Sequence, residues 1–178
     1  CPLPTIYLSP STQEFNEYAD GLGTEEEWMN RLADAMEPQL TASGIRFTRN
    51  TPDMTAASSI QASNAGSYDL HLALHTNASG AGQAGRNRGI LAFYYPGSPR
   101  GQRAAGFFVD GLKAIYPLPA LVRTEPTTTI GEVRRTRAPA VLLELGFHDN
   151  PEDAQWIVTH IDAMAESLVL SLTEYFGL

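Results

Sequence analysis

Apolar residues along the chain recur in five short segments that are typical of β-strands, and helical patterns lie between or after most of them. The strand-like segments cover residues 5–8, 45–48, 70–75, 90–95 and 140–144. The helical patterns cover residues 24–43, 55–64, 99–115 and 151–176. Alternation of this kind is typical of a mostly parallel sheet with helices on both faces. We therefore expect one α/β domain over residues 1–178, built on a mostly parallel twisted sheet of about five or six strands with helices on both faces.

Capping residues mark where two of these helices begin. Thr24 followed by Glu27 is the pattern of a capping box, and Gly44 comes where the helix should end. Asn150 and Pro151 are typical of the cap and first position of the last helix. The polar segments 76–89 and 124–136 lack a regular pattern, and long irregular segments in compact domains are often functional.

Composition and charge exclude several classes of protein. The 178 residues include 20 acidic and 12 basic side chains, for a net charge of −8, which argues against nucleic acid as a partner. No apolar run is long enough to span a bilayer and no signal segment opens the sequence, so we expect no membrane span. The only cysteine is Cys1, which argues against an internal disulfide, a zinc–thiolate cluster and a buried cysteine nucleophile.

The apolar segment 141–147 places an acid, Glu144, at the carboxyl end of a predicted strand, just before Gly146. Side chains at the carboxyl ends of strands in open α/β sheets face the ligand crevice. Glu144 is therefore a candidate general acid and base. The alternative is a strand that merely ends in a polar residue.

Two histidines lie on one face of the strand that begins at Leu70. The alternation places His71 and His75 on the same side, about 13 Å apart, with His75 at the crevice. One metal ion cannot bind both. His75 is the candidate metal ligand, and a hydrogen-bonded structural histidine is the alternative.

Glu25 lies in the middle of the apolar stripe of the first helix, whereas Glu26 and Glu27 lie outside it. Acids in a first helical turn commonly just complement the helix dipole. A buried ionised carboxylate, however, is costly unless it is paired with a cation or a metal. Because catalytic zinc sites typically use three ligands of the His and Glu type, Glu25 is a second candidate ligand.

Three segments resemble conserved blocks of the zinc-dependent N-acetylmuramoyl-L-alanine amidases, which are bacterial cell-wall hydrolases. They read TEEEWMNRLADAMEPQLTASG at 24–44, DLHLALHTNA at 69–78 and ELGFHDNPEDA at 144–154. The resemblance implies an α/β fold, Zn²⁺ as cofactor, and hydrolysis of the amide bond between N-acetylmuramic acid and L-alanine in peptidoglycan. It assigns catalysis to Glu144 and zinc binding to Glu25 and His75.

One position departs from this family. Thr12 stands where the family has its first zinc-binding histidine. We hypothesise that His148 supplies the missing nitrogen, with Asp149 or Asn150 fixing its ring. The alternative for His148 is a surface loop residue.

Two other functions stay open. One is a catalytically impaired amidase-like domain that binds peptidoglycan or a partner, and the other is a metal-dependent peptidase. For the amidase we expect peptidoglycan or muropeptides as substrate, action in the bacterial cell wall or outside the cell, and a monomer. Basic residues in the two irregular segments could orient the carboxylates of a peptide stem, although such residues are more often solvated: Arg86, Arg88, Arg134, Arg135 and Arg137. His160, in the last helix, is expected to be structural.

Overall fold

The computed structural model describes residues 2–178 and shows a single domain built on a six-stranded sheet, in the order β2-β1-β3-β6-β4-β5. Cys1, and with it the prediction about that cysteine, lies outside the described residues. The strands are β1 (Thr5–Pro10), β2 (Arg46–Arg49), β3 (Leu70–Asn77), β4 (Ile90–Tyr94), β5 (Val122–Pro126) and β6 (Ala140–Phe147). All neighbouring pairs are parallel except β4 and β6. The predicted fold class is confirmed.

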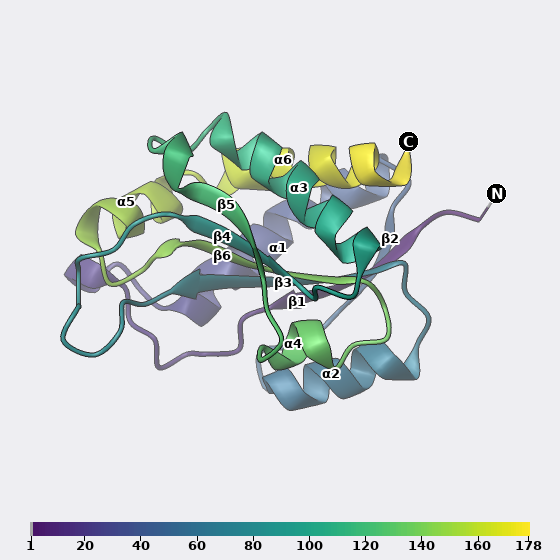
Figure 1. The fold of residues 1–178 in the computed structure, drawn as a ribbon, viewed down its shortest axis with the longest axis horizontal. Coiled ribbons are helices and arrows are strands. Elements are labelled where there is room, and N and C mark those ends of the chain that lie inside the picture. The colour runs from purple at the N-terminus through teal and green to yellow at the C-terminus, as the bar shows by residue number, and fades with distance from the viewer. Residues whose placement is uncertain (1) are drawn as a thin grey trace.

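Helices cover both faces of this sheet unequally (Figure 1). The thick side carries α1 (Glu25–Ala42), α3 (Pro99–Lys113) and α6 (Ile161–Phe176), and the thin side carries α2 (Ala56–Ala65) and α4 (Gly131–Arg134). The remaining helices are α5 (Pro151–Thr159), η1 (Ala19–Gly21) and η2 (Pro119–Leu121). α5 packs on β6 and on η1. Within residues 2–178, every helix is too short or too polar to cross a membrane.

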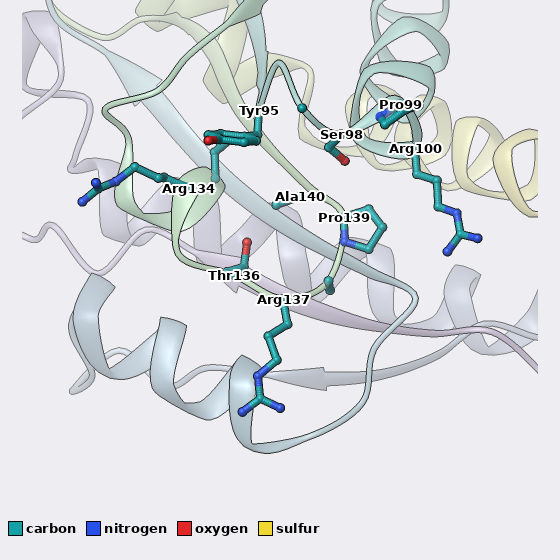
Figure 2. A pocket seen from close by; sticks show the side chains of 12 residues that line it. Tyr95, Ser98, Pro99, Arg100, Arg134, Thr136, Arg137, Pro139 and Ala140 are labelled. Carbon is teal, nitrogen blue, oxygen red and sulfur yellow. The ribbon is translucent and has the colours of Figure 1, made fainter.

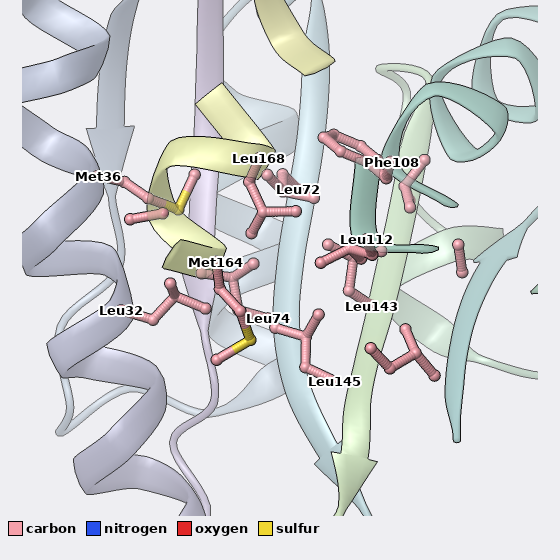
Figure 3. Close-up of a cluster of buried hydrophobic side chains, with 14 of the residues drawn as sticks. Leu32, Met36, Leu72, Leu74, Phe108, Leu112, Leu143, Leu145, Met164 and Leu168 are labelled. Carbon is pink, nitrogen blue, oxygen red and sulfur yellow. The ribbon is translucent and has the colours of Figure 1, made fainter. Parts of the chain in front are cut away.

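The main core lies between the sheet and the thick helical side. Alternate residues of β3 and β6 point into it and meet the apolar stripes of α1, α3 and α6, as Figure 3 shows for Leu32, Met36, Leu72, Leu74, Phe108, Leu112, Leu143, Leu145, Met164 and Leu168. The intervening residues of the same strands face the thin side, where Ala73, Val133 and Leu142 form a smaller cluster. His71, His75 and Glu144 therefore share the thin side, at different heights along the strands.

The predicted caps are present, with one difference. Thr24 accepts a hydrogen bond from the backbone N–H of Glu27, at 3.2 Å. The Glu27 side chain does not complete the box but pairs with Arg31, at 2.8 Å. Asn150 accepts from the backbone of the first turn of α5, as predicted.

Two elements in the predicted irregular segment 124–136 were missed, and one helix was predicted too long. β5 is an edge strand whose short sequence alternates poorly, and α4 is a single turn stabilised by its contacts with α2 and β6. The last helix divides into α5 and α6 at His160, whose backbone leaves the helical region. Its ring stacks on Trp156 and hydrogen-bonds the carbonyl of that residue, which confirms a structural role for His160.

Candidate active site

The carboxyl ends of β3 and β6 meet the first turn of α1 at one edge of the sheet. His75 and Glu144 are direct neighbours in the parallel pairing of β3 with β6. Glu25 is the first residue of α1, and its Oε2 lies 2.9 Å from Nδ1 of His75. Residues from three segments that are far apart in the sequence thus lie close together, as a single site built from them requires.

Glu25 is 1% exposed, which agrees with its predicted place on the buried stripe of α1. Asn16 donates to its Oε1 at 2.8 Å. Burial alone would raise the pKa of Glu25, but the hydrogen bonds from His75 and Asn16 outweigh it and hold the pKa below its usual value. Glu25 is therefore a buried carboxylate that stays ionised.

The other side of the His75 ring faces a carboxylate that the sequence did not point to. Nε2 of His75 lies 3.0 Å from Oε2 of Glu132, on α4. Burial lowers the pKa of His75, but hydrogen bonds to Glu132 and Glu25 outweigh it and raise the pKa to about 10. His75 thus lies between two carboxylates.

Glu132 is itself buried and has three hydrogen-bond donors. Ser9 donates to its Oε1 at 2.6 Å and His71 contacts the same oxygen through Nε2 at 3.0 Å, while His75 binds Oε2. These bonds outweigh burial and lower the pKa of Glu132 to about 2. Sequence analysis missed Glu132 because an acid beside Arg134 in a polar segment is typical of an exposed ion pair. The one available signal is that Glu132 is the only acid in residues 127–137.

Glu144 differs from the other two carboxylates. Its Oε2 is buried and has no hydrogen-bond partner within residues 2–178. Burial raises the pKa of Glu144 to about 7; His75 opposes this shift and Glu25 adds to it. A carboxyl group with a pKa near 7 is suited to both accepting and donating a proton.

His148 is buried close to Glu25, so the alternative of a surface loop residue is wrong. It is 5% exposed, and its ring stacks on Tyr18 with the ring centroids 5.5 Å apart. Its Nδ1 lies 2.9 Å from Oγ1 of Thr76 and 4.0 Å from Oε1 of Glu25. Gly146 turns the chain toward this position with a φ of +116°, in a region that favours glycine.

The predicted partners of the His148 ring are wrong. Asp149 instead accepts hydrogen bonds from the backbone N–H groups of Ser79 and Gly85. Asn150 is occupied as the cap of α5. Thr76 holds the ring in their place, and Tyr18 in turn contacts the Thr76 hydroxyl at 3.0 Å.

The candidate zinc ligands are few at this edge of the sheet. As they stand, no three His, Cys, Asp or Glu side chains within residues 2–178 are grouped to hold a metal. Two donors nevertheless fit zinc. The Glu132 carboxylate can only accept, so Nε2 of His75 carries a proton. Nδ1 of His75 then lies 2.9 Å from Oε2 of Glu25, the distance of a hydrogen bond from a second ring proton, and a bound zinc ion would have to replace that proton.

Three of the five arginines predicted in the irregular segments lie in two different places. Arg88 is held by Asp153 and Glu152, at 2.8 and 2.9 Å, and is structural. Arg134 and Arg137 line a separate cavity of about 510 Å³ together with Arg100. Their side chains extend away from one another around its rim (Figure 2). This cavity lies at the start of β6, at the end of the strand away from Glu144.

Carboxylates and imidazoles gathered at the carboxyl edge of a doubly covered sheet define an α/β domain with an enzyme-type cluster of side chains. The family model described as N-acetylmuramoyl-L-alanine amidase matches residues 13–174. The chain therefore belongs to this family, whose reaction is hydrolysis of the amide bond between N-acetylmuramic acid and L-alanine in peptidoglycan, as the sequence predicts.

Solved structures show the same fold at low sequence identity. The amidase AmiC2 of Nostoc punctiforme superposes with a TM-score of 0.84 at 13% identity, over 98% of both chains. The amidase Ami1 of Mycobacterium smegmatis gives 0.81 at 16%, over 98% of this chain and 97% of that one. An amidase of Clostridium difficile 630 gives 0.78 at 19%, over 99% and 98%. A search of curated proteins finds no match.

Proposed function

We propose that residues 1–178 form the catalytic domain of a zinc-dependent amidase, in which Glu144 is the catalytic acid and base and Glu25, His75 and His148 hold the metal. The observation that carries the proposal is the convergence, at one edge of the sheet, of the Glu25–His75 pair and of Glu144, whose Oε2 has no hydrogen-bond partner within residues 2–178. Zinc, when bound, would polarise the scissile carbonyl and lower the pKa of a water molecule.

Glu144 moves the protons. Its carboxylate accepts a proton from the attacking water and passes it to the nitrogen of the leaving L-alanine. Its Oε2 is free of competing hydrogen bonds within residues 2–178, and its pKa near 7 allows both transfers. Glu25, which stays ionised, supplies negative charge for a bound cation instead.

His148 supports the proposal through its position. The Glu25 carboxylate lies between two imidazoles, with His75 at Oε2 and His148 nearer Oε1. One carboxylate and two imidazoles are a typical donor set for catalytic zinc. His148 would have to exchange its contact with Thr76 for the metal.

Substrate and location follow from the family. We expect action on peptidoglycan or muropeptides in the bacterial cell wall or outside the cell, by a monomer. The acidic surface expected from a net charge of −8 does not match a nucleic-acid partner.

The test is Glu144→Gln, assayed for release of L-alanine amino ends from purified peptidoglycan in the presence of zinc. The substitution keeps the size of the side chain and removes proton transfer, so we expect a fall of about 10²- to 10⁴-fold in kcat with the fold retained. Glu152→Gln, an exposed acid on α5, is the matched control and should be fully active. Near-normal activity of Glu144→Gln would contradict the proposal.

A second candidate is wall binding without hydrolysis. It is favoured by the same site, because Thr12 replaces the first histidine and three metal donors are not grouped within residues 2–178. A wild-type protein that sediments with purified peptidoglycan but releases no L-alanine amino ends, with zinc supplied, would favour it. Cleavage within the stem peptide would instead indicate the peptidase.

A further inference from the structure

The cavity of about 510 Å³ at the start of β6 has no part in the proposed reaction. It lies between the start of α3 and the segment that joins α4 to β6. Ala140, in its lining, precedes Glu144 by four residues of β6, which is about 13 Å along a strand. The volume is in the range of ligand-binding cavities in other proteins.

This cavity is cationic, although the protein is acidic. Three of its 12 lining residues are arginines and none is an acid, whereas the whole chain has 20 acids and a net charge of −8. Arg100, Arg134 and Arg137 are exposed and form no ion pair within residues 2–178. The arginines that do pair with acids lie elsewhere: Arg31, Arg49, Arg88 and Arg123. The three guanidinium groups of the cavity can therefore bind anionic groups of a ligand.

The directions of these side chains indicate the shape of that ligand. The guanidinium groups extend from the rim away from one another (Figure 2), so they are not arranged to hold one small anion between them. They suit separate anionic groups on one extended molecule. A guanidinium binds a carboxylate through two parallel hydrogen bonds, so carboxylates fit this rim well.

The lining between the arginines is apolar. It is formed by Val133, Ala138, Pro139 and Ala140, and Tyr95 adds an aromatic ring that is 39% exposed. The ligand that fits carries small apolar groups as well as carboxylates. The stem peptides of peptidoglycan have this chemistry, because their alanine methyl groups lie next to residues with free carboxylates. A polymer of phosphodiesters has the charge but lacks the apolar side chains.

We propose that this cavity is a docking site for the carboxylate-bearing stem peptides of peptidoglycan, separate from the catalytic edge of the sheet. Arg134 and Arg137 pair with the carboxylates, and the apolar lining contacts the alanine side chains. The site rests on the proposed peptidoglycan substrate but not on a bound metal. Because stem peptides recur along the polymer, this second contact raises the affinity for the polymer above that of the catalytic edge alone.

The experiment measures cosedimentation with purified peptidoglycan from which attached phosphate polymers have been removed by acid. Every protein carries Glu144→Gln, so that the polymer is not cleaved during binding. Arg134→Gln/Arg137→Gln removes two exposed charges and should retain the fold, and we expect its affinity to fall about 10- to 100-fold. The control, Lys113→Gln/Arg123→Gln, removes the same charge from exposed positions outside the cavity and should bind as the parent protein does.

Peptidoglycan whose carboxyl groups have been converted to amides tests the chemistry of the ligand. The parent protein and Arg134→Gln/Arg137→Gln should bind this polymer equally, because it offers the arginines no carboxylates. A difference between the two proteins that persists on the amidated polymer would overturn the assignment of stem carboxylates as the ligand.

The remaining outcomes are also distinct. Equal binding of the parent protein and Arg134→Gln/Arg137→Gln to the untreated polymer would overturn the site, and a difference seen only on walls that keep their phosphate polymers would assign the cavity to those polymers instead. An equal loss in the control would show that the overall charge, and not the cavity, determines binding. A parent protein that does not bind peptidoglycan at all would overturn the proposed substrate and this site together.

Discussion

Three carboxylates around one imidazole are held in different states by their hydrogen bonds. Glu25 and Glu132 have donors and a lowered pKa, whereas Glu144 has a buried oxygen without a donor in residues 2–178 and a pKa raised to about 7. Groups whose environments push their pKa values apart are typical of acid–base sites. The contrast arises from the partners of each oxygen, since all three carboxylates are at least partly buried.

The raised pKa of Glu144 predicts a pH-dependent penalty on the stability of the metal-free protein. A carboxyl group with a folded pKa near 7 and an unfolded pKa near 4.5 stabilises the fold below pH 4.5, and this contribution is lost as the pH rises through 7. Glu144→Gln stays neutral at both pH values. The difference in free energy of unfolding, variant minus wild type, should therefore be on the order of 3 kcal/mol larger at pH 8 than at pH 4.

Urea unfolding at both pH values, with chelator present, measures this difference. Glu27→Gln, which changes a half-exposed acid of α1 paired with Arg31, is the control and should show no such change. A difference between Glu144→Gln and wild type that is the same at pH 4 and pH 8 would show that Glu144 has an ordinary pKa.

At the scale of elements, Asp153 of α5 binds the carboxyl end of β6. It is fully buried and accepts from Tyr116 at 2.6 Å, from Arg88 at 2.8 Å and from the backbone of Phe147 at 2.9 Å. It also accepts from the backbone of Gly89, just before β4. The segment that carries His148 is thereby attached to a fixed helix end.

We predict that Asp153→Ala lowers the free energy of unfolding by about 3–5 kcal/mol, because it leaves the buried Tyr116 hydroxyl, Nε of Arg88 and the backbone N–H groups of Phe147 and Gly89 without their acceptor. Denaturant unfolding measures the change. The neighbouring Glu152→Ala removes an exposed partner of the same Arg88 and should stay within about 0.5 kcal/mol of wild type. Equal losses in the two variants would show that the buried bonds of Asp153 contribute no more than the surface pair.

Elements differ in how far their sequences predict them. α1 and α5 begin where Thr24 and Asn150 predict, because capping is a local interaction between a side chain and the next turn. β5 and α4 have too few residues for a periodic pattern and form through contacts with β4, α2 and β6. The missed Glu132 lies on one of these elements, so the error in the fold and the error in the site have the same cause.

At the scale of the whole molecule, metal binding would link the first turn of α1 to the ends of β3 and β6. A ligand that binds only the folded state stabilises it by an amount set by its concentration relative to the dissociation constant. At 100 times that constant the gain is about 2.7 kcal/mol, which for a domain of this size raises Tm by about 5–10 °C.

We therefore predict that zinc raises Tm in wild type and that Glu25→Gln and His148→Ala remove most of the shift. Thermal unfolding with zinc and with chelator measures it, and Glu27→Gln, in the same turn as Glu25, should behave as wild type. A full zinc shift in His148→Ala would remove His148 from the proposed ligands and leave Glu25 and His75.

The sequence by itself determined the α/β alternation, the helix caps, the buried place of Glu25 and the strand-end places of His75 and Glu144. These features depend on periodicity and capping over a few residues, which the order of amino acids states directly. Only the tertiary structure decided that Glu132 binds His75 and that Thr76 binds His148. Those partners are 57 and 72 residues apart in the chain, and no local pattern encodes which side chains the packing of strands and helices will bring together.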